Sequence, residues 1–377
     1  MDLAIAHPFL YTKGGAERVV LRIAQEFDAT IYVSRYEKEK AFSEFKELDV
    51  RVIPSKLRWF VPPFFPMRVR DAVIAGRQFY NYVLKEDFDV INAHGTPSQW
   101  IRNKNSPVVW YCHTPNREAF DLYDWRMSKR NIFEKAFYWA AIQPYRAIEP
   151  RIVPKLEHIF ANSANTQNRL KKYLSMDSEV LSPRIDYKEF FCTGFDKFFF
   201  YPSRITPEKR FEYAIEAFKI FKKAHPGWRF VIAGALVSER KEHVSYCKRL
   251  KELLGEDGEI LTDVPFNRFL DLYSSCSAVI YTPVNEDFGI IPLEAGASSK
   301  PCLSVNEGGP REVVVDGKTG YLVNSVGELA DKMCFLADNL GVAEKIGEAA
   351  RRHIRENFGW ESFFRRFKEV CRKTTKI

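Results

Sequence analysis

The stretch "SAVIYTPVNEDFGIIPLEAGA", residues 277–297, carries the strongest indication of the fold. Its first seven residues, 277–283, are mostly β-branched, aromatic or small, and they predict a short buried strand. Pro292 can open a helix, because a residue in the first turn has no intrahelical N–H bond to lose. The stretch therefore predicts a turn at the carboxyl end of a strand, which is the edge where open parallel α/β sheets bind ligands.

Two glutamates, Glu286 and Glu294, lie in this turn and at the start of the helix that follows it. With Pro292 at the first helical position, Glu294 is at the third, where a carboxylate interacts favourably with the helix dipole. Glu286 has no comparable structural explanation, so we take it as a candidate functional residue. Because we place it in a loop, we expect its replacement by alanine to cost little stability.

Strand-like runs alternate with helix-like runs on both sides of this stretch. Such alternation implies parallel sheets with right-handed crossovers and helices on both faces, an α/β fold. The strand-like runs are residues 2–7, 29–34, 89–94, 107–112, 158–163, 198–203, 229–234, 258–263, 277–283 and 301–305. The clearest helix-like runs are residues 16–27, 211–224, 267–276 and 360–372.

The chain has 377 residues, which is too long for one ordinary core and fits two domains. We expect an N-terminal domain at 1–181, a linker at 182–196 and a second domain at 197–356. Residues 357–377 predict a C-terminal helix that packs back toward the N-terminal domain, because its aromatic side needs a large apolar partner.

Composition and charge narrow the class of protein. With 46% hydrophobic and 15% aromatic residues the chain is a packed globular protein. Its net charge of +8 would suit nucleic acid, a membrane surface or a phosphorylated small molecule, or it reflects a solvated basic surface. Seven dispersed cysteines without a C-x-x-C pair argue against a disulfide framework and a zinc site. Without a long apolar run or a basic leader, we expect a cytoplasmic chain.

Two stretches carry groups that are suited to binding phosphate. Each of them follows the first predicted strand of one of the two domains. In "TKGGAERVV", residues 12–20, the backbone N–H groups of Gly14 and Gly15 could approach a phosphate at a helix N-terminus. The alternative is a plain glycine turn. In "SRITPEKR", the planar guanidinium of Arg204 and the compact ammonium group of Lys209 could both bind a diphosphate. The alternative is a solvated basic turn.

Two other stretches indicate a functional site less specifically. His113, in "YCHTPNREAF", follows a predicted strand and could hydrogen-bond a ligand, although a lone histidine is more often structural. The stretch "NEGGPREVVVDGKTGYLV", residues 306–323, predicts a tight loop and then a hairpin turn at "DGKTG".

The order of these stretches resembles that of the retaining glycosyltransferases of family 4, whose GT-B fold has two facing Rossmann-like domains with a cleft between them. The resemblance covers essentially the whole chain, from "TKGGAERVV" through the E-x7-E of residues 286–294 to "GGPREVVVDGKTGYLV". E-x7-E alone is a weak pattern, and the order of the set makes it specific. "YCHTP" and "SRITPEKRFEYAIEAF" are most similar to the mannosyltransferases of O-antigen and related cell-surface polysaccharides. The chain departs from the family at "GGPRE", where an extra residue often precedes the proline.

The resemblance implies a role for each catalytic candidate. Arg204 and Lys209 would bind the donor diphosphate and stabilise the charge that grows on it as the glycosidic bond breaks. Glu286 would hold sugar hydroxyls, and His113 would touch the sugar near the reacting carbon. The metal sites of other sugar transferases use a D-x-D motif. We expect no such metal site here, and we expect the two cations to replace a metal ion.

The resemblance also implies the groups that bind the donor, which we expect to be GDP-mannose. Gly14 and Gly15 would supply N–H groups, and Glu294 would accept hydrogen bonds from the ribose hydroxyls. Three further backbone N–H groups would help Glu286 to hold the sugar, those of Phe288, Gly289 and Ile290.

The acceptor is expected to be a glycan or a lipid-linked molecule. Residues 55–70 and 124–146 mix aromatic with basic side chains, as segments on a membrane surface do. The alternative is that these aromatic residues form core and interdomain contacts. The residues expected to carry the membrane contact are Trp59, Phe60, Phe64 and Phe65.

Four alternative functions remain open at this stage. A glycoside hydrolase would also use two carboxylates and would turn over a simple glycoside without a nucleotide. A nucleotide-sugar epimerase would turn over the donor without an acceptor, and a related transferase would use a UDP sugar. A nucleic-acid binder is indicated by charge alone and would show steeply salt-dependent affinity, and we expect no nucleic-acid partner.

Overall fold

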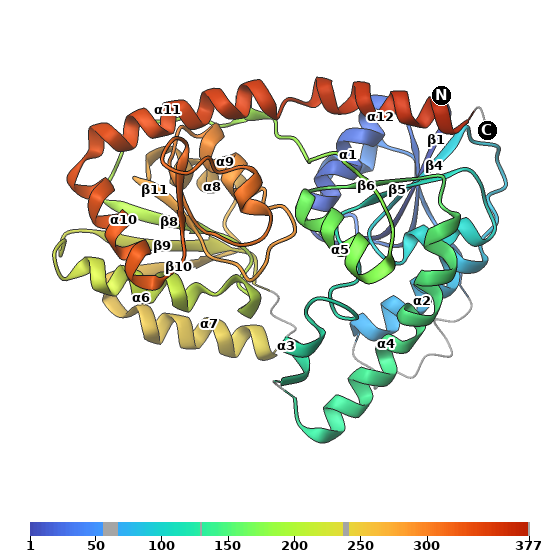
Figure 1. Ribbon diagram of the computed structural model, residues 1–377, viewed down its shortest axis with the longest axis horizontal. Coiled ribbons are helices and arrows are strands. Elements are labelled where there is room, and N and C mark those ends of the chain that lie inside the picture. Colours follow the sequence, from blue (N-terminus) through green and yellow to red (C-terminus); the bar gives the residue numbers. More distant parts are fainter. Residues whose placement is uncertain (56–66, 129, 237–240, 376–377) are drawn as a thin grey trace. The chain divides into compact units, whose positions relative to one another are not determined.

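The computed structural model describes residues 1–55, 67–128, 130–236 and 241–375, and the chain divides into two compact units (Figure 1). The first unit contains Met1–Pro183 together with Glu361–Ile377, and the second contains Arg184–Trp360. Each unit is built on one parallel sheet with helices on both faces. The predicted α/β fold with two doubly wound sheets is therefore confirmed.

The described part of the first unit has a seven-stranded parallel sheet in the order β3-β2-β1-β4-β5-β6-β7. Its central strands are buried on both faces and read as nearly continuous apolar runs, as parallel strands do. The strands are β1 (Leu3–Leu10), β2 (Thr30–Tyr36), β3 (Val50–Val52), β4 (Val90–His94), β5 (Val108–Cys112), β6 (His158–Ala161) and β7 (Glu179–Val180).

Helices cover both faces of this sheet (Figure 1). One face packs against α2 (Met67–Asn81), η3 (Ser98–Asn103), α4 (Ile132–Ile152) and α5 (Ala164–Leu174). The other face packs against α1 (Gly15–Phe27) and α12 (Trp360–Thr374). The shorter helices of the unit are η1 (Ser43–Glu47), α3 (Tyr123–Ser128) and η4 (Val153–Lys155).

The C-terminal helix α12 belongs to the first unit. Its Phe364 lies edge-on to Phe27 of α1, with ring centroids 6.0 Å apart, and its Phe367 packs on Phe160 of β6 at 6.0 Å. Phe363, also of α12, is 5.7 Å from the ring of Tyr111. The aromatic side of the last helix thus meets the apolar partner that its sequence requires.

The second unit has a six-stranded parallel sheet in the order β10-β9-β8-β11-β12-β13, counted over its described residues. The equivalent order, 3-2-1-4-5-6, is that of dinucleotide-binding Rossmann sheets. The strands are β8 (Phe198–Pro202), β9 (Arg229–Gly234), β10 (Gly258–Thr262), β11 (Ala278–Tyr281), β12 (Cys302–Val305) and β13 (Gly320–Val323).

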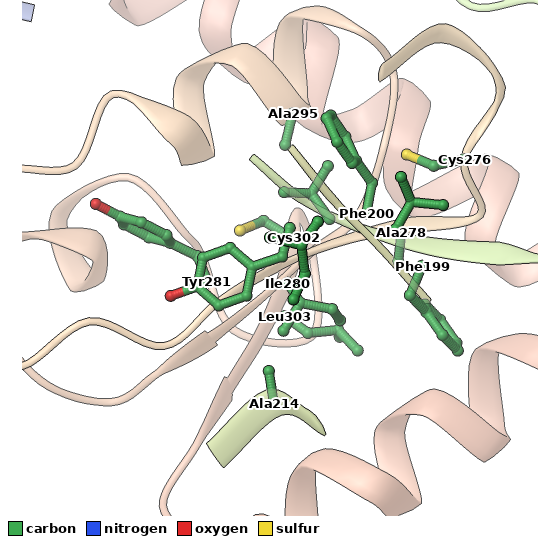
Figure 2. Close-up of a cluster of buried hydrophobic side chains, with 14 of the residues drawn as sticks. Phe199, Phe200, Ala214, Cys276, Ala278, Ile280, Tyr281, Ala295, Cys302 and Leu303 are labelled. Carbon is green, nitrogen blue, oxygen red and sulfur yellow. The ribbon is translucent and has the colours of Figure 1, made fainter. Parts of the chain in front are cut away.

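Two helical layers enclose this second sheet (Figure 1). One layer contains α6 (Phe211–Lys222), α7 (Lys241–Leu254) and α10 (Val326–Asp338), and the other contains α8 (Phe266–Ser275), α9 (Ile291–Ala297) and α11 (Leu340–Asn357). Figure 2 shows part of the core, where Phe199 and Phe200 of β8 lie beside Ile280 of β11 and Leu303 of β12. The short 3-10 helices are η5 (Tyr187–Glu189), η6 (Pro207–Lys209), η7 (Gly255–Asp257) and η8 (Gly309–Glu312).

The segment 182–196, expected as a linker, contributes to the second unit from residue 184 onward. Ile185 and Phe190 are buried in the core of that unit, and Phe190 lies edge-on to Tyr273 at 5.9 Å. Because this segment carries apolar residues, it packs into the core of the second unit and does not form an extended linker.

The hairpin predicted at "DGKTG" is wrong. β13 follows this turn and pairs with β12 in parallel, so the turn joins η8 and the loop after it to a new parallel strand. Gly317 has a φ of +70°, and its N–H donates to the Gly320 carbonyl at 2.9 Å. The glycine-rich turn is real, but tight turns do not by themselves determine which strands they join.

No helix in the described segments of the chain is long and apolar enough to cross a membrane. Trp59, Phe60, Phe64 and Phe65, which were expected to contact a membrane surface, lie outside the described residues.

Candidate active site

The residues predicted to bind the donor follow strands near the centre of each sheet. Each sheet has a switch point, where the strand order reverses, between β1 and β4 in the first unit and between β8 and β11 in the second. Ligands of open α/β sheets bind at the carboxyl ends of the strands at such points. Gly14 and Gly15 follow β1, Arg204 and Lys209 follow β8, and Glu286, Phe288, Gly289 and Ile290 follow β11, all at a switch point, whereas His113 follows β5, the neighbour of β4.

Lys209 and Glu286 form a direct ion pair at the switch point of the second unit. The Nζ of Lys209 lies 2.6 Å from Oε2 of Glu286, and the two side chains are only 9% and 17% exposed. Lys209 ends the short helix η6, and Glu286 lies in the loop after β11. The structure therefore joins a residue expected to bind the diphosphate to one expected to bind the sugar.

This ion pair gives Glu286 a structural role that its sequence did not indicate. A buried amine that loses the carboxylate paired with it is costly, because its charge remains in a medium of low dielectric. The expectation that Glu286 could be replaced at little cost to stability therefore does not follow from this geometry.

Two buried tyrosines from the central strands support the pair. Lys209 donates to the hydroxyl of Tyr281 at 3.3 Å, and burial together with the charge of Glu286 raises the pKa of Tyr281 well above its ordinary value. Tyr201 donates its hydroxyl hydrogen to the Lys209 carbonyl and accepts from the Thr282 N–H at 3.0 Å. Both tyrosines were predicted only as strand residues, and their position near the ends of these strands was the available signal.

The glycine pair of "GGPRE" packs directly against the loop that carries Glu286. The Gly309 N–H donates to the Glu286 carbonyl at 2.9 Å, and a Cβ on Gly309 would lie 2.3 Å from the Phe288 Cα. Gly308 has a φ of +68°, and a Cβ there would lie 2.6 Å from the backbone of Glu286. Both positions require glycine, and the pair acts as a support for the predicted sugar-binding loop.

Arg210 is a further residue of this region that the sequence did not single out. Its guanidinium donates to the carbonyls of Thr282 at 2.9 Å and Pro283 at 3.1 Å, and it pairs with the carboxylate of Glu307. Arg210 thereby ties the "SRITPEKR" turn to the loops after β11 and β12. Arg204, in contrast, is exposed to solvent.

Glu294 lies in the first turn of α9, which begins at Ile291, so Pro292 is the second helical residue instead of the first. Its Oε2 accepts a hydrogen bond from the hydroxyl of Tyr273, in α8, at 2.6 Å. The carboxylate thus connects two helices of the same layer. The predicted contact of Glu294 with a ribose remains a prediction.

In the first unit, the carboxylate of Glu17 lies over the turn that contains Gly14 and Gly15. Gly14 caps α1, and a Cβ on it would lie 2.5 Å from Oε2 of Glu17. Oε1 of Glu17 accepts from the Thr12 hydroxyl at 3.1 Å. A phosphate at this helix N-terminus would have to displace the carboxylate, since both are anionic.

His113 belongs to a cluster of ring nitrogens at the carboxyl ends of β4 and β5. Its Nε2 lies 3.0 Å from Nδ1 of His94, and Nε2 of His94 lies 2.5 Å from Oδ1 of Asn92. Burial lowers the pKa of His94 well below its ordinary value, and burial together with nearby His7 lowers the pKa of His113 to about 3. Both rings are therefore neutral at physiological pH.

The loop after His113 is held by α5. Thr166 donates its hydroxyl hydrogen to the His113 carbonyl at 3.3 Å, and Arg169 donates to the Thr114 hydroxyl at 3.0 Å. His94 and Asn92 were predicted only as part of a strand. The available signal was that His94, like His113, stands at the carboxyl end of a central strand.

Metal-binding geometry is not found among the described residues, where no three His, Cys, Asp or Glu side chains group around a common point. One D-x-D sequence, at 87–89, is present in the chain. It precedes β4 at the amino end of the strand, and Asp89 accepts a hydrogen bond there from the Asp2 N–H at 2.8 Å. This motif is therefore at the opposite edge of the sheet from the predicted site.

Comparison with known proteins gives matches over nearly the whole chain. The profile described as Glycosyltransferase Family 4 matches residues 13–188, and the profile described as Glycosyl transferases group 1 matches residues 189–353. The alpha-1,3/1,6-mannosyltransferase ALG2 of Dictyostelium discoideum is 27% identical, with 99% of this chain and 98% of that protein covered. The human ALG2 is also 27% identical, with 98% of this chain and 95% of that protein covered.

Solved structures agree on the fold. Sucrose-phosphate synthase from Thermosynechococcus elongatus superposes with a TM-score of 0.78 at 14% identity, covering 99% of both chains. HepE from Anabaena, solved with UDP and glucose, has a TM-score of 0.74 at 16% identity, covering 99% of this chain and 100% of that one. With both halves of the chain matched by glycosyltransferase profiles and both units matched in fold, the chain belongs to the family 4 glycosyltransferases of the GT-B fold.

Proposed function

We propose that the chain transfers mannose from GDP-mannose to a glycan or lipid-linked acceptor, with retention of the anomeric configuration and without a metal ion. The mannosyl specificity is supported by the full-length similarity to proteins named alpha-1,3/1,6-mannosyltransferases. The reaction type is supported by the chemistry of the residues at the switch point of the second unit.

The observation that carries the proposal is the Lys209–Glu286 pair. Lys209 Nζ lies 2.6 Å from Glu286 Oε2 at the carboxyl end of the central strands, where a nucleotide sugar would place its diphosphate and hexose. An ammonium group can bind the diphosphate, and a carboxylate can accept hydrogen bonds from sugar hydroxyls. The pair also keeps each charge compensated while no donor is bound.

Positive charge at this place favours the bond-breaking step. As the bond between the sugar C1 and the diphosphate oxygen breaks, negative charge grows on the diphosphate and positive charge grows on the sugar ring. Lys209 and the exposed Arg204 stabilise the first of these, and a fixed cation there contributes more in the transition state than in the ground state. A diphosphate leaving group that is stabilised in this way needs no separate general acid.

A thermal-shift panel of GDP, UDP and ADP sugars, followed by transfer assays, tests the proposal. A ligand at 100 times its Kd adds about 2.7 kcal/mol of stability, so the preferred donor should give the largest shift. We expect GDP-mannose to give that shift, transfer to persist in EDTA, and the product anomer to match the donor by NMR.

Other outcomes of the same panel identify the alternatives. A preference for a UDP sugar would overturn the mannosyl assignment and leave the transferase class intact. Turnover of the donor in the absence of any acceptor would indicate an epimerase, and turnover of a simple glycoside would indicate a hydrolase.

We further propose that the first unit contacts the cytoplasmic face of a membrane that carries the acceptor, through the start of α4. Ile132, Phe133 and Trp139 expose 73%, 84% and 53% of their surface. Asn131 and Glu134 fix this end of the helix with a reciprocal capping box. Exposed aromatic residues on a rigid helix end can enter the headgroup boundary without spanning the bilayer.

Liposome co-sedimentation tests this contact. With anionic vesicles at low salt, the protein should pellet, and a variant with serine at Ile132, Phe133 and Trp139 should remain in the supernatant. Ile220→Ser is the matched control, because Ile220 is 48% exposed but lies in the second unit. Release by the control, or no pelleting of the native protein, would leave a soluble acceptor as the better proposal.

A further inference from the structure

We propose that His94, oriented by Asn92, is a positioning residue that fixes the tautomer of His113, leaving Nδ1 of His113 as a bare acceptor for a hydroxyl of the bound sugar. The tautomer follows from contacts within the first unit alone. The sugar contact rests on the proposed function.

The chain of hydrogen bonds begins at Asn92, in the middle of β4. Its Nδ2 donates to the Val109 carbonyl at 3.0 Å, and a carbonyl can only accept. The opposite atom of the amide, Oδ1, therefore faces Nε2 of His94 at 2.5 Å. Because Oδ1 also can only accept, the hydrogen of His94 is on Nε2.

The second step passes this constraint to His113. A neutral imidazole has one donor and one acceptor, so His94 with its hydrogen on Nε2 has a bare Nδ1. Nδ1 of His94 lies 3.0 Å from Nε2 of His113 and must accept a hydrogen from it. His113 therefore has its hydrogen on Nε2 and a bare nitrogen at Nδ1.

The surroundings keep both rings neutral. The rings of His94 and His113 contact the ring of Tyr111, at 5.2 and 5.0 Å between centroids, and burial lowers the pKa of both histidines. His7 lies beside them and donates from Nδ1 to the His94 carbonyl at 3.2 Å, and its Nε2 lies 3.7 Å from Glu17. The carboxylate of Glu17 acts in the opposite direction on His113 but does not outweigh burial.

The second ring nitrogen of His113, Nδ1, is available for a ligand. Across the described residues, no group bonds Nδ1 of His113, and the side chain is only partly buried. A bare nitrogen accepts a hydrogen bond from a hydroxyl, whereas the other tautomer or the imidazolium would present a hydrogen there. A neutral ring also avoids repulsion of the positive charge that grows on the sugar during transfer.

Three variants separate positioning from packing. His94→Leu removes the acceptor that holds the His113 hydrogen. His94→Asn keeps an acceptor oxygen near the place of Nδ1. Asn92→Asp places a carboxylate against His94, which favours the imidazolium and turns Nδ1 of His94 into a donor. His158→Leu is the control, because His158 is a histidine of the same sheet outside the cluster.

Long-range proton–nitrogen NMR correlations report the tautomer directly, and steady-state kinetics report its consequence. In the native protein at about pH 7, His113 should show a protonated Nε2 and a bare Nδ1. The tautomer should become mixed in His94→Leu, remain in His94→Asn and reverse in Asn92→Asp. His94→Leu and Asn92→Asp should lower kcat by about tenfold, the value of one hydrogen bond, and His94→Asn by less. His158→Leu should change neither the tautomer nor kcat.

The outcomes distinguish this inference from the proposed function. A native protein with the hydrogen of His113 on Nδ1 overturns the inference whatever the substrate. Equal losses of kcat in His94→Leu and His94→Asn with an unchanged tautomer also overturn it and leave only a packing role for His94. The expected tautomer in a protein that binds no sugar nucleotide of the panel overturns the proposed function and the sugar contact together.

Discussion

Each unit has a group of predicted site residues at the carboxyl ends of its central strands, and the two groups differ in their electrostatics. In the first unit, His94 and His113 are held neutral by burial and joined by a hydrogen bond of 3.0 Å. In the second unit, Lys209 and Glu286 are joined as an ion pair at 2.6 Å. The same strand order therefore supports a neutral hydrogen-bonding group in one unit and a compensated charge in the other.

The difference shows that the same strand order can present either a neutral hydrogen-bonding group or a fixed charge. A diphosphate carries charge and is best bound by a cation, whereas a sugar ring carries hydroxyls and gains positive charge as it reacts. We expect substitutions of the charged pair to change both stability and transfer strongly. Substitutions of the neutral cluster should have smaller effects that depend on the sugar and on pH.

The largest effect is expected for Lys209→Met. Loss of the ammonium group removes the charge that stabilises the leaving diphosphate, so kcat should fall by about 10²–10³-fold. Lys318→Met is the control, because Lys318 is exposed in the turn before β13. A fall of less than about tenfold in a transfer assay would remove Lys209 from the proposed chemistry.

The second expected effect concerns the contribution of Glu286 to stability. Glu286→Ala leaves the amine of Lys209 buried without its carboxylate, which costs about 3–5 kcal/mol for a buried pair and less here because Glu286 is 17% exposed. Glu286→Gln keeps a hydrogen-bond acceptor for the amine and should cost less. Urea unfolding measures both variants, and equal stability of Glu286→Ala and the native protein would show that the pair contributes nothing to folding.

The third expected effect concerns Gly309, which packs against the loop that carries Glu286. Gly309→Ala would place a Cβ 2.3 Å from the Phe288 Cα, so the loop must shift and the free energy of unfolding should fall by about 1–3 kcal/mol. The matched control is Gly341→Ala in α11, where a Cβ meets open space and alanine favours the helix. If both variants were equally stable, the support of the Glu286 loop by this glycine would be contradicted.

The last expected effect is a pH dependence that comes from the two neutral rings of the first unit. The pKa values of His94 and His113 are depressed in the folded state, so the unfolded chain binds more protons below about pH 6.5. Stability from these rings is complete above that pH and is lost as the pH falls toward the folded values. We expect each ring to account for a loss of about 1–2 kcal/mol between about pH 7 and pH 5.

The contribution of Glu149 to stability changes with pH in the opposite direction, so the test uses a variant that lacks this carboxyl group. Burial raises the pKa of Glu149 to about 7, so its contribution to stability increases as the pH falls from 7 toward its unfolded value. Urea unfolding of Glu149→Gln should therefore show the loss on acidification, and adding His94→Asn should reduce it. An acid-insensitive Glu149→Gln variant would contradict the neutral state of the two rings.

The sequence predicted the strands of each sheet better than it predicted the side-chain contacts within each unit. Buried parallel strands are short apolar runs, so all ten expected strands are found, whereas β3, β7 and β13 were missed. β3 and β7 have only three and two residues, too few for a periodic pattern, and β13 was hidden by a turn that suggested a hairpin.

The candidate site was located by strand ends, but its pairings were not predictable. Lys209 and Glu286 are 77 residues apart, and they meet only because β8 and β11 are neighbours in the sheet. The role of Arg210 depends in the same way on the loops after β11 and β12. Sequence reasoning placed each residue at the correct edge, and the tertiary fold determined its partner.

The most direct test of the roles proposed for Lys209 and His113 is calorimetric titration of GDP and GDP-mannose into Lys209→Met and His113→Leu. Lys209→Met should weaken the binding of both ligands alike, by about tenfold or more, because both carry the diphosphate. His113→Leu should leave the affinity for GDP unchanged and weaken GDP-mannose alone. Equal weakening of GDP and GDP-mannose by His113→Leu, or unchanged GDP binding in Lys209→Met, would contradict the assignment of His113 to the sugar and of Lys209 to the diphosphate.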